Sequence, residues 1–138
     1  RVGRTGVTDT FARRARQESM RDFRELKVWQ KAHEVTLIVY RTTAGFPSQE
    51  KYGITGQLRR AAVSIAANIA EGAGRRSERE FARFLDIAMG SASELEYLLL
   101  LSHDLKVLDQ EHYRNLDGLA VEIKRMLAGF LKKICGNG

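Results

Sequence analysis

The chain has 138 residues, of which 43% are hydrophobic and 29% are charged, and its formal net charge at pH 7 is +6. With one proline, this composition indicates a globular chain and not a disordered one, and the length fits a single domain. The single cysteine, Cys135, excludes an internal disulfide, and the longest apolar run, residues 98–101, is too short to cross a membrane. We therefore expect a soluble, cytoplasmic protein.

Most of the positive charge lies near the N-terminus. Residues 1–24 contain seven arginines and three acidic residues, and residues 1–21 show no lasting apolar period. We interpret residues 1–21 as a flexible basic extension and residues 22–135 as the folded domain. Met20, directly before the first periodic segment, is a candidate for the natural start of the chain.

A helical pattern begins at Asp22 and is predicted to end at Gly45-Phe46-Pro47, because proline cannot continue a helix. A short helical turn is predicted between Ser48 and Tyr52. Apolar and aromatic residues spaced three or four apart give the first helix one expected core face: Leu26, Trp29, His33, Leu37 and Tyr40.

The second helix is predicted to begin near Thr55, a candidate N-cap, and to end at Gly72 and Gly74. Its expected core face is Leu58, Ala62, Ile65 and Ile69, and three further alanines would permit close helix approach: Ala61, Ala66 and Ala70.

Two more helices follow. Ser77 and Glu80 have the spacing of a capping box, which predicts the start of a third helix that runs to about Ser102. Asp109 is the predicted N-cap of the fourth. The expected core residues are, in the third helix, Phe81, Phe84, Leu85, Ala88, Ala92, Leu95, Leu98 and Leu99, and in the fourth, Tyr113, Leu116, Ala120, Ile123, Leu127, Phe130 and Ile134. Helices of similar length joined by short loops predict an all-α, antiparallel up-and-down four-helix bundle.

The third and fourth helices carry more leucine than one bundle face needs. Contiguous apolar surface on soluble proteins usually marks an interface, so we expect self-association. The alternative is a wide core stripe with scattered exposed leucines. The candidate interface residues are Leu98, Leu100, Leu101, Leu119, Met126 and Leu131.

No catalytic, metal or cofactor motif is recognisable. None of His33, His103 and His112 completes a Glu-x-x-His pair. Cys135 has no basic partner near it except Lys132 and Lys133, and a nucleophile needs a positioned general base. Gly72-Ala73-Gly74 follows a helix, whereas a dinucleotide loop follows a strand. We expect a protein that is not an enzyme and that needs no cofactor or metal.

Arginines concentrate around the junction of the second and third helices. Such a surface could bind nucleic-acid phosphates or an acidic protein partner. The alternative is a solvated face whose arginines form local ion pairs, such as Arg76 with Glu80. Glu71 is predicted to pair with Arg60 or with an arginine of another chain. The candidate nucleic-acid-binding residues are Arg59, Arg60, Arg75, Arg76, Arg79 and Arg83.

An ordered series of segments resembles the four-helix bundle protein family, also called the 23S rRNA intervening-sequence protein family. The segments are residues 23–29 (FRELKVW), 46–47 (FP), Glu50, 52–53 (YG), 57–65 (QLRRAAVSI), 68–72 (NIAEG), Phe81, 84–85 (FL), 90–92 (GSA) and 94–96 (ELE). The resemblance covers roughly residues 23–134 and implies a left-handed bundle assembled as a homopentamer. Members are often encoded within inserts in bacterial large-subunit ribosomal RNA genes. The family is also similar to the accessory proteins of diversity-generating retroelements, basic pentamers that bind nucleic acid and a reverse transcriptase.

Two functions remain open at this point. The first is a non-catalytic oligomer that binds nucleic acid, RNA above all, through backbone phosphates and without base stacking. The second is a protein-binding scaffold or accessory subunit, in which any nucleic-acid binding comes from the N-terminal arginines.

Overall fold

The computed structural model describes residues 21–50 and 53–136, and every regular element within those ranges is helical. Two short 3₁₀ turns, Phe23–Glu25 and Ser48–Glu50, flank the first of four long helices. The long helices are α2 (Lys27–Thr43), α3 (Ile54–Ala73), α4 (Glu78–Asp104) and α5 (Gln110–Ile134). The predicted all-α class, the count of four long helices and the short turn after residue 47 are confirmed.

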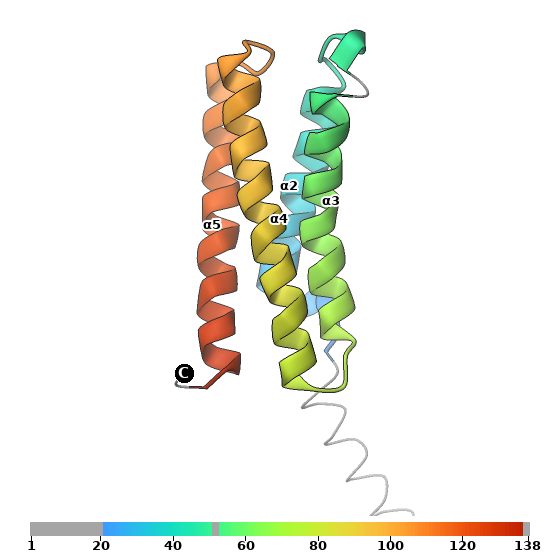
Figure 1. Cartoon of the computed structure of the whole chain (residues 1–138), viewed down its shortest axis with the longest axis vertical. Helices are drawn as coiled ribbons and strands as arrows, with labels where there is room; N and C mark the ends of the chain where they lie inside the picture. The colour runs from blue at the N-terminus through green and yellow to red at the C-terminus, as the bar shows by residue number, and fades with distance from the viewer. Residues whose placement is uncertain (1–20, 51–52, 137–138) are drawn as a thin grey trace, which may run out of the picture.

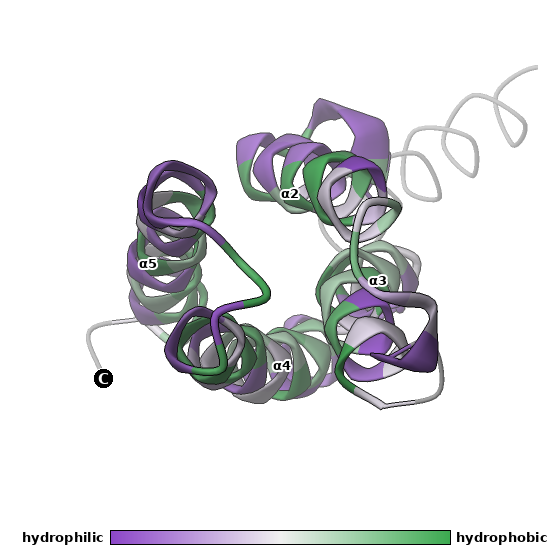
Figure 2. Ribbon diagram, turned by 90° about the horizontal axis from the view of Figure 1, so that it is seen from above, coloured by the Kyte–Doolittle hydropathy of each residue, from purple (hydrophilic) through white to green (hydrophobic). Residues whose placement is uncertain are grey.

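Successive helices run in opposite directions and lie side by side. In Figure 1 the chain ascends along α2, descends along α3, ascends along α4 and descends along α5. Seen from above, in Figure 2, the helices stand at the corners of a square, and each packs against its two neighbours in chain order, with α5 closing onto α2. The buried apolar residues of all four helices form a single core.

The core face of α2 differs from the prediction. The structure buries Val28, Ala32, Val35 and Val39, and leaves His33, Leu37 and Tyr40 on the surface. Both sets recur with helical spacing, so α2 has two apolar faces. The side chains on the buried face are smaller, which allows the backbones of neighbouring helices to approach closely.

Helix α3 begins one residue before the predicted N-cap. Gly53 precedes its first residue, and Thr55 lies inside the first turn with only 6% of its surface exposed. The predicted face of Leu58, Ala62, Ile65 and Ile69 is buried, as expected.

The predicted caps of α4 and α5 are confirmed. The Ser77 hydroxyl accepts a hydrogen bond from the backbone N–H of Glu80 at 3.0 Å, and an Asp109 carboxylate oxygen accepts one from His112 N–H at 2.8 Å. Each cap satisfies an amide that the helix leaves without an internal partner.

Arg21 is bonded to the bundle, although the sequence places it in the extension. Its backbone N–H donates to the carbonyl of Ala73 at 2.8 Å, and its guanidinium binds Glu78 through two hydrogen bonds of 2.7 and 2.9 Å. The guanidinium also lies 4.6 Å from the centre of the Phe81 ring. Residues 1–20, which form the rest of the predicted extension, lie outside the described residues.

No helix in the described part of the chain is both long and apolar enough to cross a bilayer.

Candidate nucleic-acid interface

The candidate site lies at the turn between α3 and α4. Helix α3 stops at Ala73, and Gly74 directs its N–H to the carbonyls of Glu71 and Gly72. Arg75 N–H then bonds to Gly72 O at 3.0 Å, and α4 starts after Ser77. Only residues 74–77 join the two helices, so the turn is short.

Close contact at Gly72 fixes how α3 and α4 pack next to this turn. A Cβ atom added at Gly72 would lie 2.7 Å from Cβ of Phe84 and 2.9 Å from Cδ1 of Phe81. Both distances are shorter than carbon atoms tolerate, so only glycine fits here without movement of the helices. The sequence suggested Gly72 as a helix end, whereas it is a packing residue within the last turn of α3.

Arg75 in the turn and Arg83 in α4 stack on the same phenylalanine, Phe84. The guanidinium carbons of Arg75 and Arg83 lie 4.7 and 4.8 Å from the centre of the Phe84 ring, and Phe84 is itself buried. Arg75 also donates a hydrogen bond to Glu71 at 2.7 Å. Stacking on a buried ring restricts where these cations can lie before any ligand binds.

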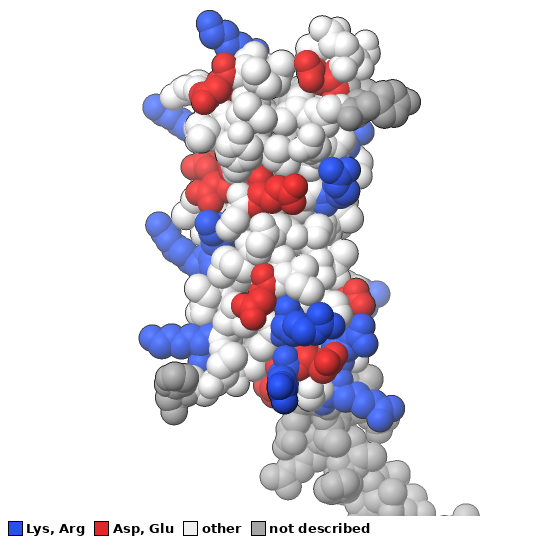
Figure 3. Space-filling view, in the orientation of Figure 1, with Lys and Arg blue, Asp and Glu red and all other residues white. Residues whose placement is uncertain are grey.

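Arg76 and Arg79 are exposed, and neither has a carboxylate within ion-pair distance among the described residues. The nearby Glu71 and Glu78 are bonded to Arg75 and Arg21. Figure 3 shows lysine and arginine side chains gathered around a few carboxylates at this lower end of the molecule. Two further cations, Lys132 and Lys133, lie in the last turn of α5.

Glu71 has a different partner from the one predicted. It pairs with Arg75, four residues later on the same chain, and 55% of its side-chain surface is exposed. The prediction of Arg60 or a second chain assumed that Glu71 lies at the buried face, where a carboxylate needs a partner from elsewhere. At the surface, a pair at i and i+4 spacing meets that need locally.

The six candidate arginines do not form one patch. Arg59 and Arg60 lie in the second turn of α3, at the other end of that helix and about 20 Å from the α3–α4 turn at 1.5 Å per residue. Arg59 donates hydrogen bonds to Thr43 Oγ1 at 2.9 Å and to the Tyr40 carbonyl at 3.3 Å, whereas Arg60 is exposed. The structure therefore brings together Arg75, Arg76, Arg79 and Arg83, and we call these four residues the arginine cluster.

The six candidate interface residues differ in how much of their surface is exposed. Leu98 is only 3% exposed, as its place among the expected core residues predicted, so within one chain it has almost no surface to offer a partner. Leu100 is 43% exposed. The remaining four pack against the core while keeping some accessible surface: Leu101, Leu119, Met126 and Leu131.

Other large apolar side chains, which are not among the predicted interface residues, are also exposed. They are Leu37, Tyr40, Val63, Ile87, Tyr97 and Leu105. The second apolar face of α2, visible in the sequence as a competing helical pattern, was the available signal for Leu37 and Tyr40.

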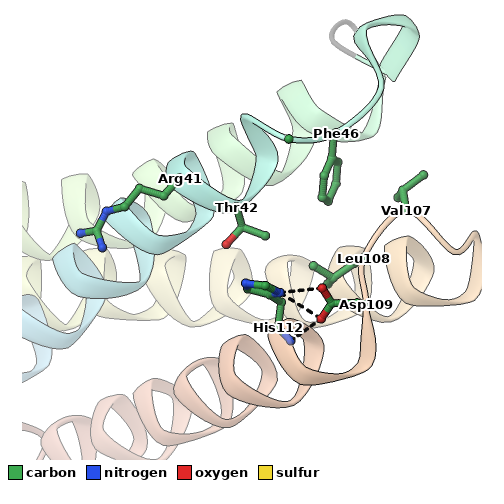
Figure 4. A pocket seen from close by; sticks show the side chains of 8 residues that line it. Arg41, Thr42, Phe46, Val107, Leu108, Asp109 and His112 are labelled. Atoms are coloured by element: carbon green, nitrogen blue, oxygen red, sulfur yellow. Dashed lines mark hydrogen bonds and ion pairs between the residues drawn. The ribbon is translucent and has the colours of Figure 1, made fainter.

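The opposite end of the bundle holds a shallow pocket of about 300 Å³ between the end of α2 and the α4–α5 loop. Figure 4 shows His112 in it, with one imidazole nitrogen directed at Asp109, to which Nδ1 lies as close as 2.7 Å. The backbone N–H of His112, followed by its imidazole, lowers the pKa of the Asp109 carboxyl. Asp109 also caps α5, so this pair is accounted for by the helix start.

Among the described residues, no three His, Cys, Asp or Glu side chains are grouped as metal ligands would be.

Comparison with known proteins identifies the family. No curated protein matches the chain. A crystal structure of a protein of unknown function of the S23 ribosomal protein family, from Bacteroides thetaiotaomicron, is similar, with 28% sequence identity and a TM-score of 0.69. The match covers 76% of this chain and 98% of that one. The model of the family described as 23S rRNA-intervening sequence protein matches residues 24–129. The chain therefore belongs to the 23S rRNA-intervening sequence protein family.

Proposed function

We propose that this protein is a non-catalytic homo-oligomer that binds RNA through backbone phosphates, using the arginine cluster. The observation that carries the proposal is the exposure of Arg76 and Arg79 beside the stacked Arg75 and Arg83, where α3 turns into α4. Four guanidinium groups at one end of an elongated bundle give a surface that can follow a phosphate backbone.

The chemistry of the cluster favours phosphates over bases. The two phenylalanines beneath the turn, Phe81 and Phe84, are both buried, so neither offers a platform on which a base could stack. Guanidinium groups bind phosphate oxygens with paired hydrogen bonds whatever the sequence. We expect binding that depends steeply on salt and weakly on base sequence.

The first prediction concerns a variant with Arg76→Gln, Arg79→Gln and Arg83→Gln. Its affinity for a fluorescently labelled single-stranded RNA is expected to fall at least about tenfold, because three phosphate contacts are lost. The slope of log affinity against log salt is expected to become shallower by about 2. Fluorescence anisotropy of the full chain between low and physiological salt measures both quantities.

A matched control removes the same charge at the opposite end of the bundle, with Arg41→Gln, Lys106→Gln and Arg114→Gln, all exposed residues. Equal losses in the two variants would mean that net charge alone attracts RNA, which contradicts a specific surface. A third variant neutralises the N-terminal arginines Arg1, Arg4, Arg13, Arg14 and Arg16. If it alone abolishes binding, the bundle has no role of its own in RNA binding.

We further propose that the bundle is left-handed and assembles as a pentamer. The family resemblance supports the subunit number, and the exposed Leu37, Tyr97, Leu100 and Leu105 supply apolar surface for subunit contacts. Native mass spectrometry at micromolar concentration is expected to give five times the mass of the chain. A monomer under those conditions would contradict the proposal.

A second candidate function is a protein-binding scaffold. The observation that favours it is the exposed apolar surface at the upper end of α4, where Tyr97 is 58% and Leu105 56% exposed. Absence of RNA binding by the full chain at low salt would favour this function over the first.

A further inference from the structure

One exposed apolar face lies where α2 and α3 run side by side. Leu37 and Tyr40 of α2 are 42% and 43% exposed, and Val63 of α3 is 42% exposed. Arg59 connects the two helices, because its guanidinium lies 4.6 Å from the centre of the Tyr40 ring and donates to the Tyr40 carbonyl at 3.3 Å. Val63 follows Arg59 by about one helical turn and therefore lies on the same side of α3. We call Leu37, Tyr40, Arg59, Arg60 and Val63 the α2–α3 face.

A second exposed face lies on α4. Tyr97 is 58% and Leu100 43% exposed, and the carboxylates of Glu94 and Asp104 are exposed at positions three and four residues from them. This spacing puts all four side chains on one side of the helix. We call these four residues the α4 face. Seen from above, α4 and the junction of α2 with α3 lie on different sides of the bundle (Figure 2).

The two faces carry opposite charges. Neither Arg59 nor Arg60 has a carboxylate within ion-pair distance among the described residues. Arg59 also keeps N–H donors free, since a guanidinium has five and two of them are used within the chain. On the α4 face, Glu94 has no cation at ion-pair distance in the described part of the chain, and Asp104 has only His103, at 3.8 Å. One face therefore offers two cations, and the other offers two carboxylates.

Charge decides which of these faces can meet. Two copies of the α2–α3 face placed together would bring four arginines close to one another, and two copies of the α4 face would do the same with four carboxylates. Like charges placed opposite each other at an interface cost free energy. The α2–α3 face of one copy against the α4 face of another instead pairs opposite charges and buries apolar side chains on both sides. Such a contact joins two different surfaces, so it builds a ring when the rotation between copies closes.

The two faces also lie at similar heights along the bundle. By the residue count from the ends of α3 and α4, Arg60 lies about 20 Å and Glu94 about 24 Å from the α3–α4 turn, at 1.5 Å per residue. Rotation about an axis parallel to the helices leaves every residue at its own height. Parallel copies therefore bring Arg60 of one level with Glu94 of the next.

We propose that the α2–α3 face binds the α4 face of a second copy of this chain, with the apolar side chains in contact and Arg60 paired with Glu94. This inference names the surfaces through which the oligomer proposed above assembles, and it rests on that part of the proposed function. Parallel copies place every arginine cluster at the same end of the assembly, so several clusters can contact one RNA strand.

The test breaks each face separately in the full chain. One variant carries Leu37→Glu with Val63→Glu, and the other carries Tyr97→Glu with Leu100→Glu. Each variant replaces apolar contacts by carboxylates. Each is expected to be a monomer in analytical ultracentrifugation at a concentration at which wild type is assembled, with the helix content by circular dichroism unchanged.

A matched control adds the same charge at exposed positions of α5, with Asn115→Glu and Ala128→Glu. This variant should assemble as wild type does. Equal loss of assembly in the control would mean that added negative charge alone separates the copies, which contradicts the assigned faces.

Mixing the two face variants shows whether the faces bind each other. Each variant keeps the face that the other lacks, so an equimolar mixture is expected to give a dimer of one copy of each. Nothing larger should form, because both remaining faces carry the introduced carboxylates. No dimer in the mixture would overturn the inference. So would full assembly of either variant alone, and full assembly of the Tyr97→Glu variant would leave the α4 face to a different protein.

Single charge reversals test the same contact if a monomeric variant does not fold. Arg60→Glu and Glu94→Arg are each expected to raise the concentration required for half-assembly by about tenfold or more, because each places like charges together. Both changes in one chain should recover most of this loss. Losses that add in the double variant would contradict the pairing.

Failure of this inference is distinguishable from failure of the proposed function. A monomeric wild-type protein would overturn the proposed oligomer and this interface together. An oligomeric wild type whose face variants still assemble would overturn the interface alone. RNA affinity, measured with the arginine-cluster variant, is an independent result.

Discussion

Replacing Phe81 with alanine is expected to lower the free energy of unfolding by about 3–5 kcal/mol, the usual cost of removing a fully buried aromatic ring. Phe81 has no exposed surface. Its ring packs edge-to-face on Phe130 of α5 with the centres 5.3 Å apart, and Arg21 lies over it. One side chain therefore connects α4 to α5 and to the residues before α2.

Urea denaturation at one fixed protein concentration measures this change, since the stability of an oligomer depends on concentration. Ile87→Ala, on the same helix but 40% exposed, is the control and should cost about 1 kcal/mol or less. If Phe81→Ala does not fold, Phe81→Leu should still show a clear loss. Equal losses for Phe81→Ala and Ile87→Ala would contradict the position assigned to Phe81 in the core.

The second large effect is expected for Gly72→Ala. Alanine is about 1 kcal/mol better than glycine in a helix interior, so a substitution without contacts would stabilise α3. Here the added Cβ would lie 2.7 Å from Cβ of Phe84, an atom fixed to the α4 backbone. Relief requires α3 and α4 to separate, and overpacking of this kind costs about 1–3 kcal/mol or more. We expect a net loss of about 2 kcal/mol.

Gly90→Ala provides a matched comparison. Gly90 lies in α4, and a Cβ there would meet nothing within 4 Å, so this substitution should stabilise the protein by about 0.5–1 kcal/mol. The opposite signs of the two effects are the result to look for in denaturation curves. A stabilising Gly72→Ala would show that the helices are further apart than the structure places them. Because Gly72 supports the turn that presents the arginine cluster, Gly72→Ala should also weaken RNA binding.

Several features of the fold follow from local chemistry and were predictable. Ser77 and Asp109 cap helices because their side-chain oxygens reach an amide only a few residues ahead, a contact that needs no other part of the chain. The buried face of α3 was also predictable, because its large aliphatic residues recur with helical spacing on that face alone. The pairing of Glu71 with Arg75 was equally local, and i, i+4 spacing could have predicted it.

The candidate site was predictable only in its composition. The sequence shows that arginines concentrate near the α3–α4 junction, but the length of α3 separates Arg59 and Arg60 from the other four. Nor does the sequence show that the guanidinium groups of Arg75 and Arg83 both stack on the Phe84 ring, since that depends on where α4 places Phe84.

The sequence by itself thus determined four helices and most of their ends, because capping and periodicity act over a few residues. It pointed to the family through the resemblance of its segments to known proteins. Only the tertiary structure decided which face of α2 is buried, and that Gly72 is a contact between helices. These outcomes depend on the shapes of side chains from different helices meeting at close-packed distances. That complementarity is a property of pairs of helices, and the pattern along any one of them does not contain it.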